Sequence, residues 1–227
     1  MEGSAFSAPI CCYLIWLFFV CSSLVLLRSA ATDADLLQDF CVAELQSSVR
    51  VNGFPCKNVA DVQGQDFVFS GLAHAGNTSL SLTGVARTPA SVLQFPGLNT
   101  QGISMVRADF APGGLNVPHL HPRASELAFI LEGTFYAGFI TTSNKLYTQT
   151  VHKGDLLIIP RGLVHFQLNI GSTPGVIMGS LNSQNPGAQL LPVTLFGTDI
   201  KDEVLEKAFQ LSRKAVEALK TKLTPKS

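Results

Sequence analysis

The chain reads GGLNVPHLHPRASELAFILEG over residues 113–133 and GDLLIIPRGLVHFQLN over residues 154–169. Both stretches place short apolar runs between Gly and Pro, a pattern typical of short strands joined by tight turns. Gly133 and Gly154 would lie where strands turn, because glycine adopts backbone conformations that a side chain resists. The two stretches also contain three of the five histidines of the chain, which makes them the candidates for a metal site.

Four side chains in these stretches are spaced as ligands of one metal ion: His119, His121, Glu126 and His165. The first two are two residues apart, so on a strand they face the same side. Glu126 opens the next strand-like run and His165 lies within a third, so three strands of one barrel would aim four ligands inward. A lone His-x-His pair usually binds no metal, but the conjunction favours metal binding. Such a set suits a borderline divalent metal and leaves about two octahedral positions open.

The remaining pattern predicts one β-rich domain. From about residue 65 to 183, short apolar runs are separated by Gly, Pro and Asn, as expected for an all-β sandwich or barrel. The predicted strands are Asp66–Ser70, Gly102–Phe110, Glu126–Leu131, Thr134–Ile140, Leu146–His152, Leu156–Ile159, Val164–Asn169 and Val176–Leu181. After Asp199 the apolar period becomes helical, which predicts two short helices with Ser212 as the N-cap of the second.

The start of the chain is typical of an exported protein. Residues 11–27 are apolar and uncharged, and Arg28 and three small residues follow. This predicts a signal peptide over residues 1–31 that is cleaved after Ala31, so that the mature chain begins near Thr32 without a membrane segment. A signal anchor is the alternative, because a run of seventeen apolar residues is close to the minimum length of a membrane span.

Cysteine usage agrees with export. Three of the five cysteines lie before residue 32, which leaves Cys41 and Cys56. In an oxidising compartment the two are expected to pair, closing a loop worth about 3 kcal/mol, with two free buried thiols as the alternative. Asn77 starts the one N-glycosylation sequon and is the candidate glycan site. The expected organisation is therefore a signal peptide, a disulfide-clipped segment over 32–64, a β-barrel domain over 65–200 and a helical extension over 201–227.

Charge constrains the partners. The 16 basic and 16 acidic residues cancel, and charged residues make up 14% of the chain, against about 25% in typical proteins. Nucleic acid is not an expected partner, because no basic stripe exists to neutralise phosphates. A surface poor in charge more often signals area buried between subunits.

The two opening stretches resemble, residue for residue, the two germin boxes of the cupin superfamily, and the chain is similar to plant germin-like proteins. The similarity covers nearly the whole chain after residue 32, including LQDFCVA at 37–43, VNGFPCK at 51–57, AGNTS at 75–79, residues 109–116, SQNPG at 183–187 and LFG at 195–197. The resemblance implies a cupin β-barrel (jelly roll) whose four ligands hold manganese. It also implies C-terminal helices that clasp a neighbouring subunit in a homohexamer, a trimer of dimers.

The function that this resemblance implies is that of a secreted glycoprotein of the plant apoplast, or cell wall. It would be a manganese-dependent oxidoreductase that dismutates superoxide, with a role in plant defence. Spacing alone does not exclude iron, zinc or copper. The alternative is a non-enzymatic wall protein whose metal site is architectural or captures a small anion.

Family members that oxidise oxalate are thought to position it with two asparagines near the metal. Asn116 matches one of them, and its amide would donate to a species bound at the metal; the competing interpretation is a turn residue after Gly113 and Gly114. Val106 stands where the second asparagine would fall and offers no donor. Oxalate oxidase activity is therefore expected to be absent or very weak.

Overall fold

The computed structural model describes residues 37–225. These belong to one compact unit, Thr32–Ser227. The expected signal peptide and the start of the mature chain lie outside the described residues. Over residues 37–225, no helix combines the length and the apolar character that crossing a membrane requires.

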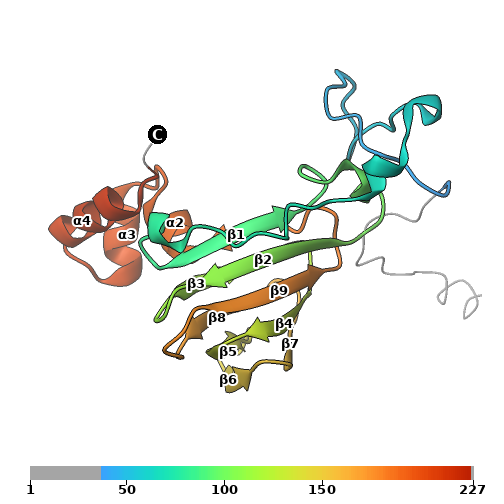
Figure 1. The fold of residues 1–227 in the computed structure, drawn as a ribbon. Coiled ribbons are helices and arrows are strands. Elements are labelled where there is room, and N and C mark those ends of the chain that lie inside the picture. Colours follow the sequence, from blue (N-terminus) through green and yellow to red (C-terminus); the bar gives the residue numbers. More distant parts are fainter. Residues whose placement is uncertain (1–36, 226–227) are drawn as a thin grey trace, which may run out of the picture. The chain divides into compact units, whose positions relative to one another are not determined.

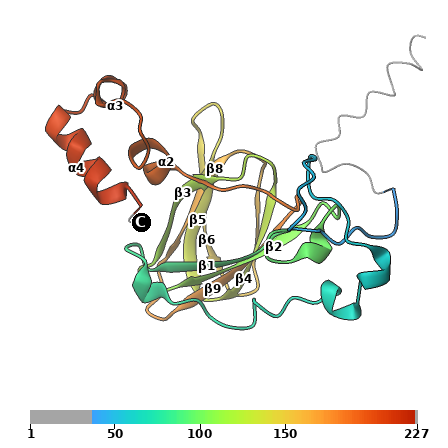
Figure 2. The same ribbon diagram turned by 90° about the horizontal axis from the view of Figure 1, so that it is seen from above.

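Two antiparallel sheets of five strands each form the barrel (Figures 1 and 2). In order, one sheet contains β1 (Val85–Ala90), β2 (Ser104–Phe110), β9 (Gly175–Leu181), β4 (Glu126–Glu132) and β7 (Leu156–Ile159). In order, the other contains β10 (Gln189–Leu190), β3 (Leu115–Leu120), β8 (Val164–Asn169), β5 (Thr134–Ile140) and β6 (Leu146–His152). The expected all-β cupin class is confirmed.

The barrel core follows from the alternation of side chains along the strands. Because successive residues face opposite sides of a sheet, each strand sends every second residue inward. The inward apolar residues form one cluster: Val85, Ala108, Phe110, Ala128, Ile130, Phe135, Ala137, Val151, Ile159 and Ile177. The predicted turn glycines are confirmed, since Gly133 and Gly154 have φ of 99° and 94°.

The predicted strand over Asp66–Ser70 is wrong. Residues Gly64–Phe67 form a 3₁₀ helix, η2, in which the Asp66 carboxylate accepts from the backbone N–H of Gln63 at 2.8 Å. The same carboxylate pairs with Lys57 at 3.1 Å. These local bonds satisfy polar groups that a strand would leave to a neighbouring chain segment.

A disulfide closes a loop within the N-terminal segment, and polar contacts hold the residues that follow it to the barrel. Cys41 and Cys56 form a disulfide, so the expected pairing is confirmed. Three further 3₁₀ helices are η1 (Val59–Asp61), η3 (Thr78–Leu80) and η4 (Pro96–Leu98). Asp109 of β2 accepts from the backbone N–H of Gly76 at 2.9 Å and pairs with Arg107 at 2.9 Å.

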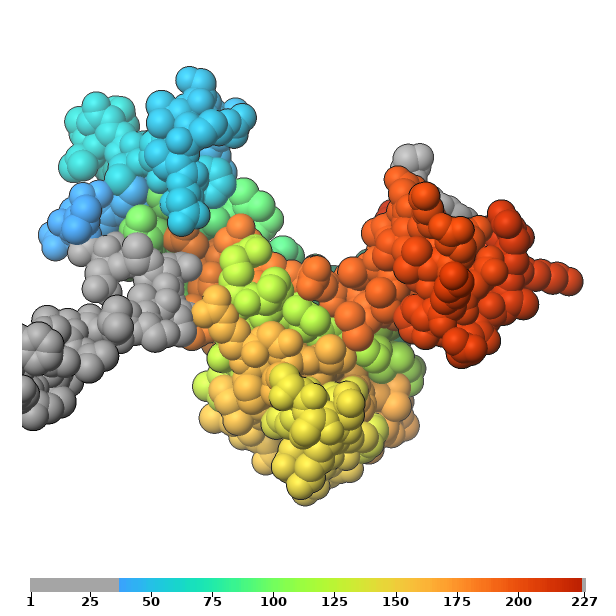
Figure 3. Space-filling model, turned by 180° about the vertical axis from the view of Figure 1, so that it is seen from behind, coloured from blue at the N-terminus to red at the C-terminus, as the bar shows by residue number. Residues whose placement is uncertain are grey.

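Three helices follow the barrel: α2 (Leu191–Phe196), α3 (Asp202–Phe209) and α4 (Arg213–Leu223). The two predicted helices are α3 and α4, and Ser212 caps α4 by accepting from the backbone N–H of Ala215 at 3.3 Å. The sequence pattern did not predict α2. The helices bury Phe196, Leu205 and Val216 in a second apolar core, and they form the red body in Figure 3.

Candidate metal centre

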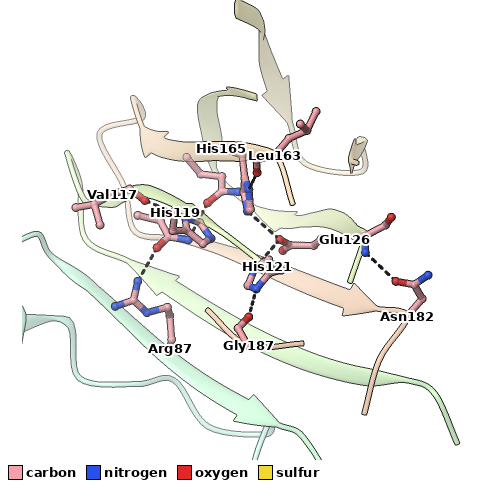
Figure 4. Close-up of polar contacts among 12 residues, drawn as sticks. Arg87, Val117, His119, His121, Glu126, Leu163, His165, Asn182 and Gly187 are labelled. Atoms are coloured by element: carbon pink, nitrogen blue, oxygen red, sulfur yellow. Dashed lines mark hydrogen bonds and ion pairs between the residues drawn. The ribbon is translucent and has the colours of Figure 1, made fainter. Parts of the chain in front are cut away.

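Strand register brings the four candidate ligands to one point inside the barrel. His119 of β3 is the register partner of His165 of β8. His121 follows β3 directly, and Glu126 opens β4 in the opposite sheet. All four residues are buried, and one potential ligand atom from each lies within 4.8 Å of the others. Figure 4 shows the three imidazoles gathered around the carboxylate.

Backbone carbonyls determine which nitrogen of each imidazole faces the centre. The Nδ1 atoms of His119, His121 and His165 lie 2.8, 2.6 and 2.9 Å from the carbonyl oxygens of Val117, Gly187 and Leu163. A carbonyl oxygen only accepts, so each Nδ1 carries the proton and donates it. Each neutral ring therefore presents an Nε2 lone pair to the centre, which is the arrangement typical of metal-bound histidine.

The carboxylate adds negative charge to these lone pairs. Oε2 of Glu126 lies 3.2 Å from Nε2 of His121 and 3.2 Å from Nε2 of His165. Oε2 and the Nε2 of His165 are nevertheless buried without a hydrogen bond in the described chain. Buried acceptors that converge without donors are unfavourable, and a cation resolves the conflict. The residues present therefore fit a divalent metal held by three imidazoles and one carboxylate.

The pKa values follow from this crowding. Burial and the neighbouring His165 lower the pKa of His119 to about 3. Burial also acts to lower the pKa of His121, but Glu126 outweighs it and the pKa is raised. Burial acts to raise the pKa of Glu126, yet the imidazoles of His121 and His165 hold it well below its usual range. The carboxylate is therefore ionised, and of His119 and His121 the latter takes a proton more readily when no metal is bound.

A cavity of about 350 Å³ opens beside the cluster. Its walls are largely apolar, with contributions from Met105, Val106, Ile177, Leu181 and Leu190. Its volume lies within the range of small-molecule sites. Three of the candidate ligands, His119, His121 and Glu126, thus line a space that a small molecule can enter.

Asn116 lies in β3 and not in a turn, and its buried side chain lines this cavity. Its Nδ2 donates to Oε1 of Gln167 at 2.8 Å, and its Oδ1 accepts from Nη1 of Arg87 at 2.6 Å. Both ends of the amide are therefore engaged, and the turn-residue interpretation is wrong.

Three further residues shape the site and were not predicted. A Cβ at Gly179 would lie 2.5 Å from Oε1 of Glu126, so the missing side chain makes room for the carboxylate. Gln167 lies two residues after His165 on the same face of β8, and that spacing could have indicated it. Arg87 is a charged residue in a strand that the sequence pattern did not predict.

Asn77 is exposed, and its Oδ1 accepts from the backbone N–H of Ser79 at 3.0 Å as the cap of η3. An exposed position suits the acceptor of a glycan. The disulfide is consistent with secretion.

Comparison with known proteins agrees with the geometry. The sequence profile of the Cupin family matches residues 70–217. Germin-like protein 5-1 of Oryza sativa subsp. japonica is 56% identical over 200 residues, covering 87% of this chain and 89% of the relative. Germin-like protein subfamily 2 member 1 of Arabidopsis thaliana is 50% identical over 200 residues, covering 87% of this chain and 91% of the relative.

Solved structures are also similar. One, described as giving structural and spectroscopic insights into the mechanism of oxalate oxidase, superposes with a TM-score of 0.83 at 46% identity. The match covers 86% of this chain and all of that one. Profile, relatives and fold agree, and the chain therefore belongs to the cupin family and, within it, to the germin-like proteins.

Proposed function

We propose that this chain is a secreted manganese-dependent oxidoreductase that converts superoxide to hydrogen peroxide and dioxygen. The observation that carries the proposal is the buried convergence of three imidazole Nε2 atoms and one carboxylate on a point beside an open cavity. Manganese is proposed from the family, since this ligand set also suits other divalent metals.

The chain contributes ligands, charge and access. Manganese, when bound, would supply a one-electron couple between its 2+ and 3+ states. The Glu126 carboxylate reduces the formal charge of a divalent ion from +2 to +1, which still attracts an anion. The carbonyl partners fix the imidazole orientations, and the apolar walls restrict water beside the cluster. In the overall reaction two superoxide anions and two protons give one dioxygen and one hydrogen peroxide.

Oxalate oxidation is proposed to be absent or very weak, although structures of oxalate oxidase are 46% identical to this chain. Val106 lines the metal cavity and offers no hydrogen-bond donor. Asn116, the remaining candidate, has its amide nitrogen on Gln167 and its oxygen on Arg87. An oxalate oxygen beside Val106 would therefore accept no hydrogen bond from that side chain, a loss worth about 1.5–3 kcal/mol for a charged acceptor.

The proposal also includes export, a glycan on Asn77, assembly into a homohexamer and a role in plant defence. The Cys41–Cys56 disulfide and the exposed sequon support an extracellular site of action. The exposed apolar residues on the outer face of β4 and β7 support assembly: Leu127, Phe129, Leu131, Leu156 and Ile158. Mass spectrometry and light scattering of the secreted protein test these points.

Metal analysis and a superoxide assay on the secreted protein test the activity. We expect manganese near one ion per chain and dismutation above that of the same concentration of free manganese. His119→Ala should abolish both, whereas His152→Ala, which removes an exposed histidine outside the cluster, should change neither. Full metal loading without turnover would instead support the non-enzymatic wall protein with an architectural site.

A further inference from the structure

An arginine from the opposite sheet reaches into the metal cavity. Arg87 lies on β1, an edge strand of its sheet, and lines the cavity together with His119, His121 and Glu126. Its Nη1 donates to Oδ1 of Asn116 on β3 at 2.6 Å. Figure 4 shows the side chain extending from β1 toward the histidines. The contact bridges the two sheets at the cavity, and Arg87 itself remains exposed to solvent.

The charge of Arg87 has no acidic partner. A guanidinium carries five N–H donors, and in the described part of the chain its one hydrogen bond goes to a neutral amide. Other arginines differ: Arg107 pairs with Asp109 at 2.9 Å, and Arg213 pairs with Glu217 at 3.2 Å. Arg87 therefore keeps both its charge and most of its donors available at the cavity.

We propose that Arg87 is an anion-binding residue that selects compact anions for this cavity, above all those with a carboxylate. Planar carboxylates accept two parallel hydrogen bonds from one guanidinium. The one carboxylate of the lining is that of Glu126, which faces the imidazoles. With a divalent ion bound, the cavity carries a net positive charge that Arg87 extends to the solvent side. This inference rests on the proposed function and deepens it by naming the class of anions that would bind the same site as inhibitors.

Nuclear magnetic resonance tests the inference without any turnover. Acetate is titrated into metal-free and zinc-loaded protein while the Nε–Hε signal of Arg87 is followed, because zinc suits the ligands and is diamagnetic. We expect acetate to shift this signal saturably in both forms, and acetamide, its neutral counterpart of the same shape, to leave it unchanged. In Arg87→Gln, acetate binding followed by cavity resonances should weaken about 10-fold to 100-fold.

Two controls separate charge, geometry and folding. Arg87→Lys keeps the charge without the planar fork, so an intermediate affinity is expected. Arg213→Gln removes the same charge from α4, outside the cavity, and should bind acetate as the wild type does. Equal acetate affinity in wild type and Arg87→Gln, or equal shifts with acetate and acetamide, would overturn the inference.

The outcome is separable from that of the proposed function. If the protein holds no manganese or shows no dismutation, the titration of the metal-free form still reports on Arg87. If dismutation is found but Arg87→Gln leaves acetate binding unchanged, the activity stands and the anion-binding role is lost.

Discussion

The two ends of the barrel interior are built from the same strands but with opposite chemistry. β4 contributes Glu126 to the polar end and, four residues later, Ile130 to the apolar end. His165 and Phe135 are both fully buried, at 0% exposure. One is surrounded by other potential ligands, and the other packs edge-on against Phe110 with ring centroids 4.9 Å apart. Burial alone therefore does not distinguish a core from a site; what distinguishes them is whether polar atoms find partners.

The two ends also differ in what they contribute to stability. Each large apolar side chain at the apolar end stabilises the fold by about 1.5–3 kcal/mol through removal from water. At the polar end, three imidazoles and one carboxylate lose hydration, and Oε2 of Glu126 forms no hydrogen bond in the described residues. Metal binding offsets this cost. The barrel thus holds a site that is unfavourable by itself beside a core that is favourable.

The largest expected effect comes from the apolar end. Phe135→Ala should lower the free energy of unfolding by about 3–5 kcal/mol, because it leaves a cavity in the barrel core. Urea denaturation of the metal-free protein measures it. Phe129→Ala, on the outer face of β4 with 38% exposure, is the matched control with a smaller loss. Equal losses would show that the apolar end does not carry the stability assigned to it.

A substitution in the cavity wall tests whether a missing donor limits oxalate chemistry. Val106→Asn should raise oxalate-dependent peroxide production by about one to two powers of ten, because a charge-assisted hydrogen bond worth roughly 1.5–3 kcal/mol becomes available. Production is measured on manganese-loaded protein. Strong activity in the wild type would contradict the prediction, and so would an inactive variant that still binds metal.

A single methyl group placed beside Glu126 should lower the affinity of the polar end for metal. Gly179→Ala places a Cβ where Oε1 of Glu126 lies, so the carboxylate must move and metal affinity should fall about 10-fold to 100-fold. Competition with a chelator measures the affinity. Gly64→Ala, where a Cβ meets no atom within 4 Å, is the control. Unchanged affinity in Gly179→Ala would show that Glu126 is not held against β9.

The sequence predicts repetitive features of this molecule better than it predicts contacts across it. Strands β5 to β8 match the predicted bounds, since apolar alternation and glycine turns mark them. β1 was missed because Arg87, Thr88 and Pro89 interrupt any apolar run; Pro89 is tolerated because β1 is an edge strand.

At the site, the sequence spacing identifies the residues that the register gathers, but not the groups that orient them. The carbonyl of Gly187 fixes the ring of His121 across 66 residues, and every residue has a carbonyl, so no residue type signals this role. Arg87 and Asn116 meet across 29 residues and two sheets. Only the closure of the barrel brings such pairs together.

The smallest expected effect is a gradual change of metal affinity with pH. Burial acts to lower the pKa of His121, but Glu126 outweighs burial, so the net pKa lies above its usual value, whereas that of His119 falls to about 3. As pH drops, His121 is protonated before His119, and its Nε2 no longer binds metal. Metal affinity should therefore fall as pH drops below the raised pKa of His121, by at most about tenfold per pH unit for each proton taken up, and metal loading falls with it.

The stability of the metal-free protein should change with pH in the opposite direction to its metal affinity. Because the folded pKa of His121 is raised, its ion pair with Glu126 stabilises the fold fully below the unfolded pKa of about 6.5. That contribution is lost as pH rises through the folded pKa, where the neutral ring becomes free to bind metal. Imidazole resonances of the metal-free protein measure the order of titration, and Glu126→Gln should lower the pKa of His121. Protonation of His119 before His121 would show that the carboxylate does not act mainly on His121.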